Sequence, residues 1–104
     1  MDMLKLTAEE REKGAEVMKA LGHPLRLGIV QELAEGEKSV SELTRYFGCG
    51  QSMMSQQLRL LESQGLIQWR KDGTSKFCSI RNDDFLKLFS CLKKHLDLYF
   101  KCST

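Results

Sequence analysis

The sequence predicts a mainly α-helical fold with one small β-hairpin, and three observations point to it. Two segments place Glu three residues after a Thr or a Ser, which is the capping-box pattern at which helices begin. Apolar residues recur at spacings of three and four through most of the chain. The pair Asp72 and Gly73 lies between two short strand-like segments, and Asp-Gly is the strongest short signal of a hairpin turn.

Length and composition predict a single domain over residues 1–104. The 104 residues include 41% hydrophobic and 29% charged residues, which is typical of a folded protein. No stretch approaches the roughly 20 apolar residues of a membrane span, and the N-terminus lacks the pattern of a secretory signal. We therefore expect a cytoplasmic protein with no membrane partner. Its four cysteines should then be thiols, ligands or redox switches rather than structural disulfides.

The first two helices are bounded by clear signals. Thr7 and Glu10 form the first capping box, so a helix is predicted over residues 8–21. Pro24 suits the first position of a second helix, predicted over residues 24–35, because its fixed φ matches the helix and its missing N–H is not needed there.

The next two helices form the most informative local pattern. Ser39 and Glu42 form the second capping box and predict a helix over residues 39–48. A second helix is predicted over residues 51–64, after the short loop GCG. Two short helices joined by a tight glycine turn indicate a helix-turn-helix.

The last third of the chain predicts a hairpin over residues 66–80 and a helix over residues 83–101. A bare hairpin would be marginal, so it should pack on the helices. We expect the apolar stripe of the last helix to be buried against a second chain, with packing on its own domain as the alternative. That stripe comprises Phe85, Leu88, Phe89, Leu92, Leu96, Tyr99 and Phe100.

Four stretches, in chain order, are similar to a known family: LGHPLRL, SVSELTRYFG, QSMMSQQLRLLESQGLI and RKDGTSK. Over residues 15–81 the chain resembles the ArsR/SmtB family of winged helix-turn-helix repressors. The resemblance implies five helices with a two-stranded wing and a homodimer paired through its first and last helices. It also implies binding to double-stranded DNA at a palindromic operator, autoregulation, and release from the operator when an effector binds.

The residues themselves agree with DNA binding. Residues 41–104 carry ten basic and six acidic side chains, so the basic excess lies in the later part of the chain. The fourth helix offers donors and acceptors to base edges on one face, and Met53 could contact a thymine methyl. Gln57 stands where the family most often has histidine. The predicted DNA-binding residues are Gln51, Ser52, Met53, Ser55, Gln56, Gln57 and Arg59 in the helix, and Arg70, Lys71 and Lys76 as phosphate contacts in the wing.

Two alternatives to this interpretation remain. The polar helix face and the wing charges could be ordinary solvated surfaces, and a small winged helix could be a protein-interaction module. Catalysis is excluded by the absence of an activated nucleophile, a paired acid and base, or a phosphate-binding glycine loop.

The metal sites known in the family are missing from this sequence. The site on the family's last helix needs a histidine two residues after an aspartate, but Leu86 follows Asp84 at that spacing, and Leu98 follows His95 where a third ligand belongs. The site on the third helix needs a cysteine pair, where this chain has Ser39 and Ser41.

The cysteines allow three hypotheses about sensing. Cys91 and Cys102 share one face of the last helix with His95, and could form a redox or reactive-sulfur switch by oxidation or persulfidation. The same three side chains could instead bind a thiophilic metal or metalloid across a dimer. In the third hypothesis the cysteines act as small apolar residues and sense nothing. Cys49, just before the fourth helix, could be reactive or could fill a gap beneath two helices.

Overall fold

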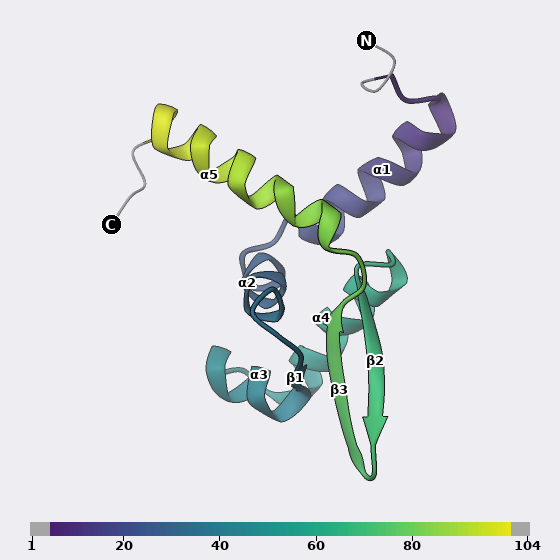
Figure 1. Cartoon of the computed structure of the whole chain (residues 1–104), viewed down its shortest axis with the longest axis vertical. Helices are drawn as coiled ribbons and strands as arrows, with labels where there is room; N and C mark the ends of the chain where they lie inside the picture. The colour runs from purple at the N-terminus through teal and green to yellow at the C-terminus, as the bar shows by residue number, and fades with distance from the viewer. Residues whose placement is uncertain (1–4, 101–104) are drawn as a thin grey trace.

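The computed structural model describes residues 5–100 and confirms the predicted fold class of five helices and a hairpin (Figure 1). The predicted helix and strand ranges differ from the observed ones by two residues or fewer, except at the last helix. In chain order the elements are α1 (Ala8–Leu21), α2 (Pro24–Leu33), β1 (Lys38–Ser39), α3 (Val40–Phe47), α4 (Gln51–Ser63), β2 (Ile67–Asp72), β3 (Ser75–Ile80), the 3-10 helix η2 (Asp83–Leu86) and α5 (Lys87–Tyr99).

Side-chain caps determine where the helices begin. The Thr7 hydroxyl accepts from the Glu10 amide, and the Glu10 carboxylate accepts from the Thr7 amide, so both arms of this capping box are present. Ser39 and Glu42 make the same reciprocal pair at the start of α3. At α2 the cap is His23, whose Nδ1 accepts from the Leu25 amide. These bonds satisfy amides that have no partner inside the helix.

The sheet has three strands in the order β1-β3-β2, all antiparallel. The additional strand β1 pairs Lys38 with Cys78 and Ser39 with Phe77, and so ties the start of α3 to the hairpin. Two residues are too few to show the alternation that identifies a strand, so sequence reasoning missed it. Gly73, at the hairpin tip, has φ of 63°, as the predicted Asp-Gly turn requires.

The hydrophobic core lies between α2, α3, α4 and the sheet. We call these elements together the body. Its innermost residues come from each of these layers, and at most 1% of their surface is accessible. They are Ile29, Val30, Leu43, Met54, Leu58, Leu61, Ile67 and Cys78.

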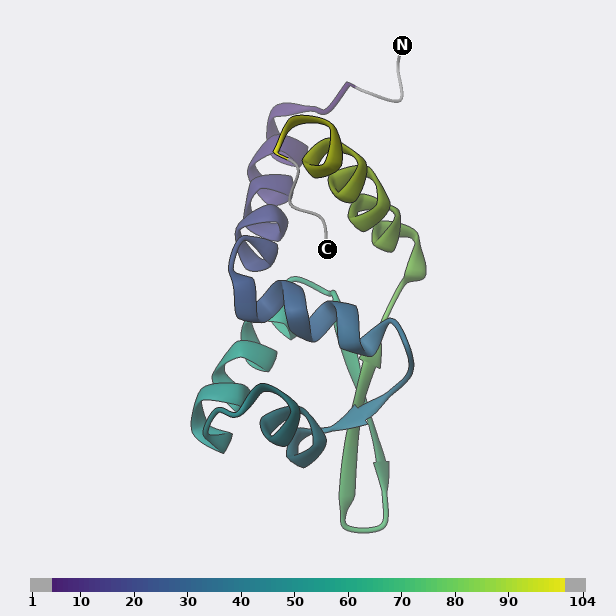
Figure 2. The same ribbon diagram turned by 90° about the vertical axis from the view of Figure 1, so that its left-hand side faces the viewer.

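The two remaining helices, α1 and α5, diverge from the body and form what we call the arms (Figures 1 and 2). Only Ala20 and Leu21, at the end of α1, are buried, and α5 buries no residue fully. The segment predicted as one helix over residues 83–101 begins with the 3-10 turn η2, capped by the Asn82 side chain. Residue 101 lies outside the described residues. No helix within residues 5–100 has the length and apolarity needed to cross a membrane.

Candidate nucleic-acid interface

The turn between α3 and α4 sets the direction of α4. Gly48 has φ of 65°, in the left-handed region where glycine carries no steric penalty, and its amide donates to the Thr44 carbonyl at 2.8 Å. Cys49 follows; it is half-buried and packs against the core. Gly50 then caps α4 without a side-chain hydrogen bond.

The outer face of α4 is polar and accessible. Gln51, Ser52, Gln56 and Arg59 are exposed, and Ser55 is half-buried. Met53 adds an apolar contact surface that is 47% exposed. Three of the predicted DNA-binding residues meet along an open groove lined by Ser52, Gln56, Arg59, Leu60 and Ser63. Spacings of three, four and seven thus place the donors and acceptors of Ser52, Gln56 and Arg59 side by side on one surface.

Gln57 lies on the opposite face, among the core residues of α4. Its side chain is 8% exposed, and it is the one buried polar residue in the described part of the chain. Its Oε1 accepts from Arg26 Nη1 at 2.6 Å, and its Nε2 donates to Met53 Sδ at 3.3 Å. Because both ends of the amide have partners inside the protein, Gln57 does not belong to the accessible polar face.

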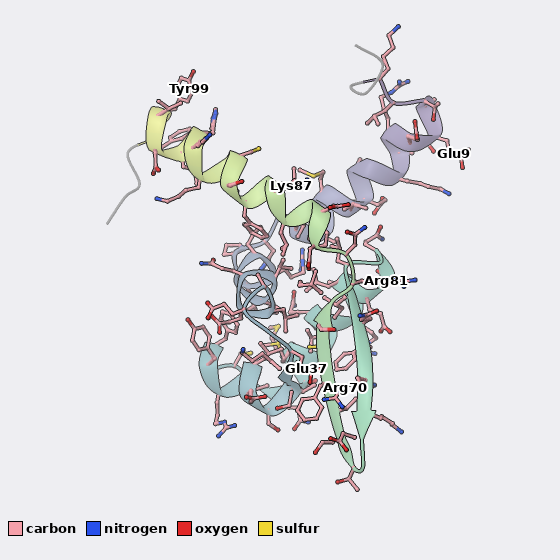
Figure 3. The ribbon with its side chains drawn as sticks, viewed as in Figure 1. Glu9, Glu37, Arg70, Arg81, Lys87 and Tyr99 are labelled. Atoms are coloured by element: carbon pink, nitrogen blue, oxygen red, sulfur yellow. The ribbon has the colours of Figure 1, made fainter. Side chains whose placement is uncertain are left out.

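Arg70, predicted as a phosphate contact, is engaged within the protein. Its guanidinium makes a two-point pair with Glu37, at 2.5 Å from Nη2 to Oε1 and 3.1 Å from Nε to Oε2. Figure 3 shows the two side chains meeting between the hairpin and the turn before β1. Asp72 lies 3.8 Å away, and the Phe77 ring centroid 5.0 Å away. The hydrogen bond from Arg70 lowers the pKa of Glu37, and the same bond raises the pKa of Arg70, so the pair stays ionised.

Two lysines supply the wing's accessible positive charge. Lys71 and Lys76 face each other across the β2–β3 ladder, and both are exposed. Lys76 Nζ lies 4.5 Å from the Trp69 ring centroid, so the ring supports an ammonium group that has no carboxylate partner among the described ion pairs. Opposed like charges cost stability unless an anion lies near them.

The thiols of β3 and α5 lie in opposite environments. Cys78 is fully buried in β3, its Sγ donates to the Lys38 carbonyl at 3.5 Å, and burial raises its pKa to about 11. Cys91 is exposed on α5, as is His95, whose ring lies 4.7 Å from that of Tyr99. Cys102 lies outside the described residues. Within residues 5–100 no group of three His, Cys, Asp or Glu side chains is arranged to hold a metal ion.

Sequence reasoning missed two residues that organise this surface. Arg26 and Glu37 each pair with a residue more than 30 positions away, Gln57 and Arg70 respectively. Gln57 itself carried a usable signal, since it is three residues from Met54 and four from Leu61 and therefore shares their inward face.

A tight glycine turn, a helix with an accessible polar face and a hairpin with exposed lysines together define a winged helix-turn-helix protein. A family model described as bacterial regulatory protein, arsR family, matches residues 23–68. An HTH-type transcriptional regulator of Mycobacterium tuberculosis is 37% identical over 83 residues, which cover 79% of this chain and 73% of that protein. The chain belongs to the ArsR family, which confirms the resemblance and the expectation that it is not an enzyme.

Two further relatives extend this comparison. The biofilm growth-associated repressor of Xylella fastidiosa is 42% identical over 71 residues, which cover 64% of this chain and 62% of that repressor. The match therefore spans about three fifths of the Xylella protein's length. The solution structure of a homodimeric winged helix-turn-helix DNA-binding domain from Mycobacterium bovis has a TM-score of 0.80 and 28% identity, over 98% of this chain and 97% of that one.

Proposed function

We propose that this chain is a homodimeric transcriptional repressor that recognises operator DNA with α4 and contacts the DNA phosphates with its wing. The observation that carries the proposal is the groove of Ser52, Gln56 and Arg59 on α4. These side chains match the hydrogen-bonding edges of bases in the major groove, where a recognition helix fits. The Mycobacterium bovis domain is described as DNA-binding, and the Xylella protein as a repressor, which supports the same role here.

The arms support a homodimer. Leu88, Leu92 and Tyr99 of α5 are 42% to 70% exposed, and Met18 of α1 is 57% exposed. One apolar groove lies between α5 and α2, and another lies between α5 and the end of α1. The exposed apolar face of α5 is therefore continuous with that of α1. Packing within one chain, the alternative, involves the start of the stripe, where Phe85 and Phe89 contact the core together with the neighbouring Leu86. A two-fold dimer through these faces would present two α4 helices to a palindromic operator.

Fluorescence anisotropy with the DNA upstream of the chain's own gene tests this function. We expect tight binding that weakens steeply between low and moderate salt, because phosphate contacts release counterions. A scrambled duplex of equal length is the control and should bind much more weakly at every salt concentration. Equal binding to both duplexes would contradict a repressor, and no binding at any salt would favour the protein-interaction module.

A pair of wing variants tests which wing residues contact the DNA phosphates. Lys71→Ala should lower the slope of log affinity against log salt by about one, because one phosphate contact is lost. Arg70→Ala should change the slope less, because Glu37 and Asp72 already pair with that guanidinium. Gln56→Ala should instead cost about 1–3 kcal/mol on the operator and relax sequence preference. An equal slope change for the two wing variants would show that Arg70 leaves Glu37 to bind phosphate.

We propose that effector sensing uses Cys91, on α5, together with Cys102, which lies outside the described residues. Cys91 is exposed and lines an apolar groove with Met18, Leu88 and Leu92. Modification of a thiol at that place would alter how two copies pair. We expect an oxidant, a polysulfide or arsenite to release the wild-type chain from DNA, and Cys91→Ser with Cys102→Ser to abolish the response. Unchanged release from the double variant would remove the cysteines as sensors.

A further inference from the structure

Arg26 joins two helices that lie on either side of α2. Figure 2 shows α2 between α1 on one side and α4 on the other. From α2, Arg26 Nε donates to the Ala20 carbonyl at 2.5 Å, and Nη2 reaches the Lys19 carbonyl at 3.4 Å. These carbonyls belong to the last turn of α1, where helical partners run out. The guanidinium therefore caps the end of an arm.

The same guanidinium holds α4 from inside. Nη1 donates to Gln57 Oε1 at 2.6 Å, and the Gln57 amide in turn donates to Met53 Sδ. Met53 lies one turn earlier, beside the accessible face of α4. A continuous path of hydrogen bonds thus runs from the last turn of α1 to a residue at the edge of the proposed DNA-reading surface.

No other side-chain hydrogen bond or ion pair among residues 5–100 joins α4 to a different element. The remaining tertiary contacts of α4 are largely apolar, through Met54, Leu58 and Leu61, and apolar packing has no preferred direction. A charge-assisted hydrogen bond does have one. The Arg26–Gln57 bond is therefore well placed to define the rotation of α4 about its own axis.

We propose that Arg26 is a positioning residue that fixes the orientation of the recognition helix relative to α1, and so sets which separation of half-sites the dimer accepts. The inference rests on the proposed function, in which the arms join two copies. Arginine suits this role because its fork of donors can serve two helices at once. Lysine carries its three donors on a single nitrogen, so it does not span acceptors on two helices as the planar fork does.

The test uses the full chain and four variants. Arg26→Lys and Gln57→Leu break the link, Gln57→Glu keeps an acceptor for Arg26, and Arg81→Lys is a matched control at an exposed position. Anisotropy is measured on the operator at its native half-site separation and on duplexes with one base pair added or removed. The salt slope and the dimer dissociation constant are measured in parallel.

We expect the two link-breaking variants to bind the native operator about tenfold more weakly and to lose their preference among the three separations. Their salt slopes and dimer dissociation constants should stay those of the wild type. Gln57→Glu and Arg81→Lys should keep the preference.

Four results would overturn the positioning role. A lower melting temperature with an intact separation preference would make Arg26 merely structural. Wild-type binding by Arg26→Lys and Gln57→Leu would leave the repressor function standing and remove this inference alone, whereas no DNA binding by the wild type would remove both. If Arg26→Lys does not fold, the contrast between Gln57→Leu and Gln57→Glu decides, and equal behaviour of those two variants counts against the proposal.

Discussion

Leu58 in the body and Leu92 in the arms are both leucines on amphipathic helices. Leu58 is fully buried, whereas Leu92 is 42% exposed. The difference lies in their surroundings. The inner face of α4 packs against α2, α3 and the sheet, whereas α5 contacts the rest of the chain mainly through its first turns and η2. The body thus fills its own core, and the arms display a face that this chain alone does not cover.

This contrast separates folding from assembly. Burial of apolar surface is the main favourable term in folding, and the body obtains it within one chain. The arms can obtain it only from another surface, so their contribution depends on concentration. Substitutions in the two regions should therefore change different measurements.

The largest effect is expected from Leu58→Ala. Removing a fully buried leucine leaves a cavity and should lower the free energy of unfolding by about 2–5 kcal/mol, a large share of the total for a small domain. Urea denaturation followed by circular dichroism measures this loss, which should be the same at low and high protein concentration. A loss that depends on protein concentration would contradict the conclusion that the body is stabilised within one chain.

Leu92→Glu should act on assembly instead. A two-fold interface contains this residue twice, so a charge there should raise the dimer dissociation constant roughly a hundredfold or more, as measured by sedimentation equilibrium. Helix content should stay unchanged. Lys94→Gln alters the charge by the same amount at the exposed Lys94 and should leave the dimer intact. Equal dimerisation of the wild type and Leu92→Glu would remove α5 from the interface.

The two capping boxes offer a matched pair with smaller effects. Ser39→Ala in the body should lower the free energy of global unfolding by about 1 kcal/mol, because the Glu42 amide loses its acceptor. Thr7→Ala removes the same bond at the far end of α1, where opening is local, so only the first turn should fray. Amide hydrogen exchange distinguishes these outcomes. A global loss from Thr7→Ala would mean that α1 unfolds together with the body.

The smallest effect is expected from the chemistry of the thiols, which should not change the free energy of unfolding at neutral pH. Iodoacetamide at pH 8 should label exposed Cys91 quickly and Cys78 only on unfolding, as followed by mass spectrometry. Burial raises the pKa of Cys78 from 9.0 to about 11, so the folded chain retains a proton that the unfolded chain loses. Stability should therefore fall as the pH rises from 9 to 11. Rapid labelling of Cys78 in the folded chain would contradict its burial.

The fold could be predicted largely because its signals are local. The capping boxes at Thr7 and Ser39, the proline of α2 and the Asp-Gly turn each act within a few residues. The exposed face of α4 followed from the same helical periodicity.

Long-range pairing could not be predicted. Nothing near Arg70 indicates that Glu37 neutralises it, since 33 residues separate them, and the bond depends on β1 bringing the chain back to the hairpin. Gln57 is predicted as a DNA contact at a family position that usually holds histidine, although its spacing from Met54 and Leu61 indicates the inward face. The placement of Cys91 beside an apolar groove depends on the end of α1 lying near the first turns of α5, which periodicity does not give.

The short strand β1 has a consequence for exchanging parts between relatives. Its pairing of Lys38 and Ser39 with β3 fastens the hairpin to the residue that caps α3, so wing and helix-turn-helix form one mechanical unit. A chimaera that takes a hairpin from another protein must take the residues before α3 with it. Length can vary freely only at the tip, around Gly73, where the chain is exposed.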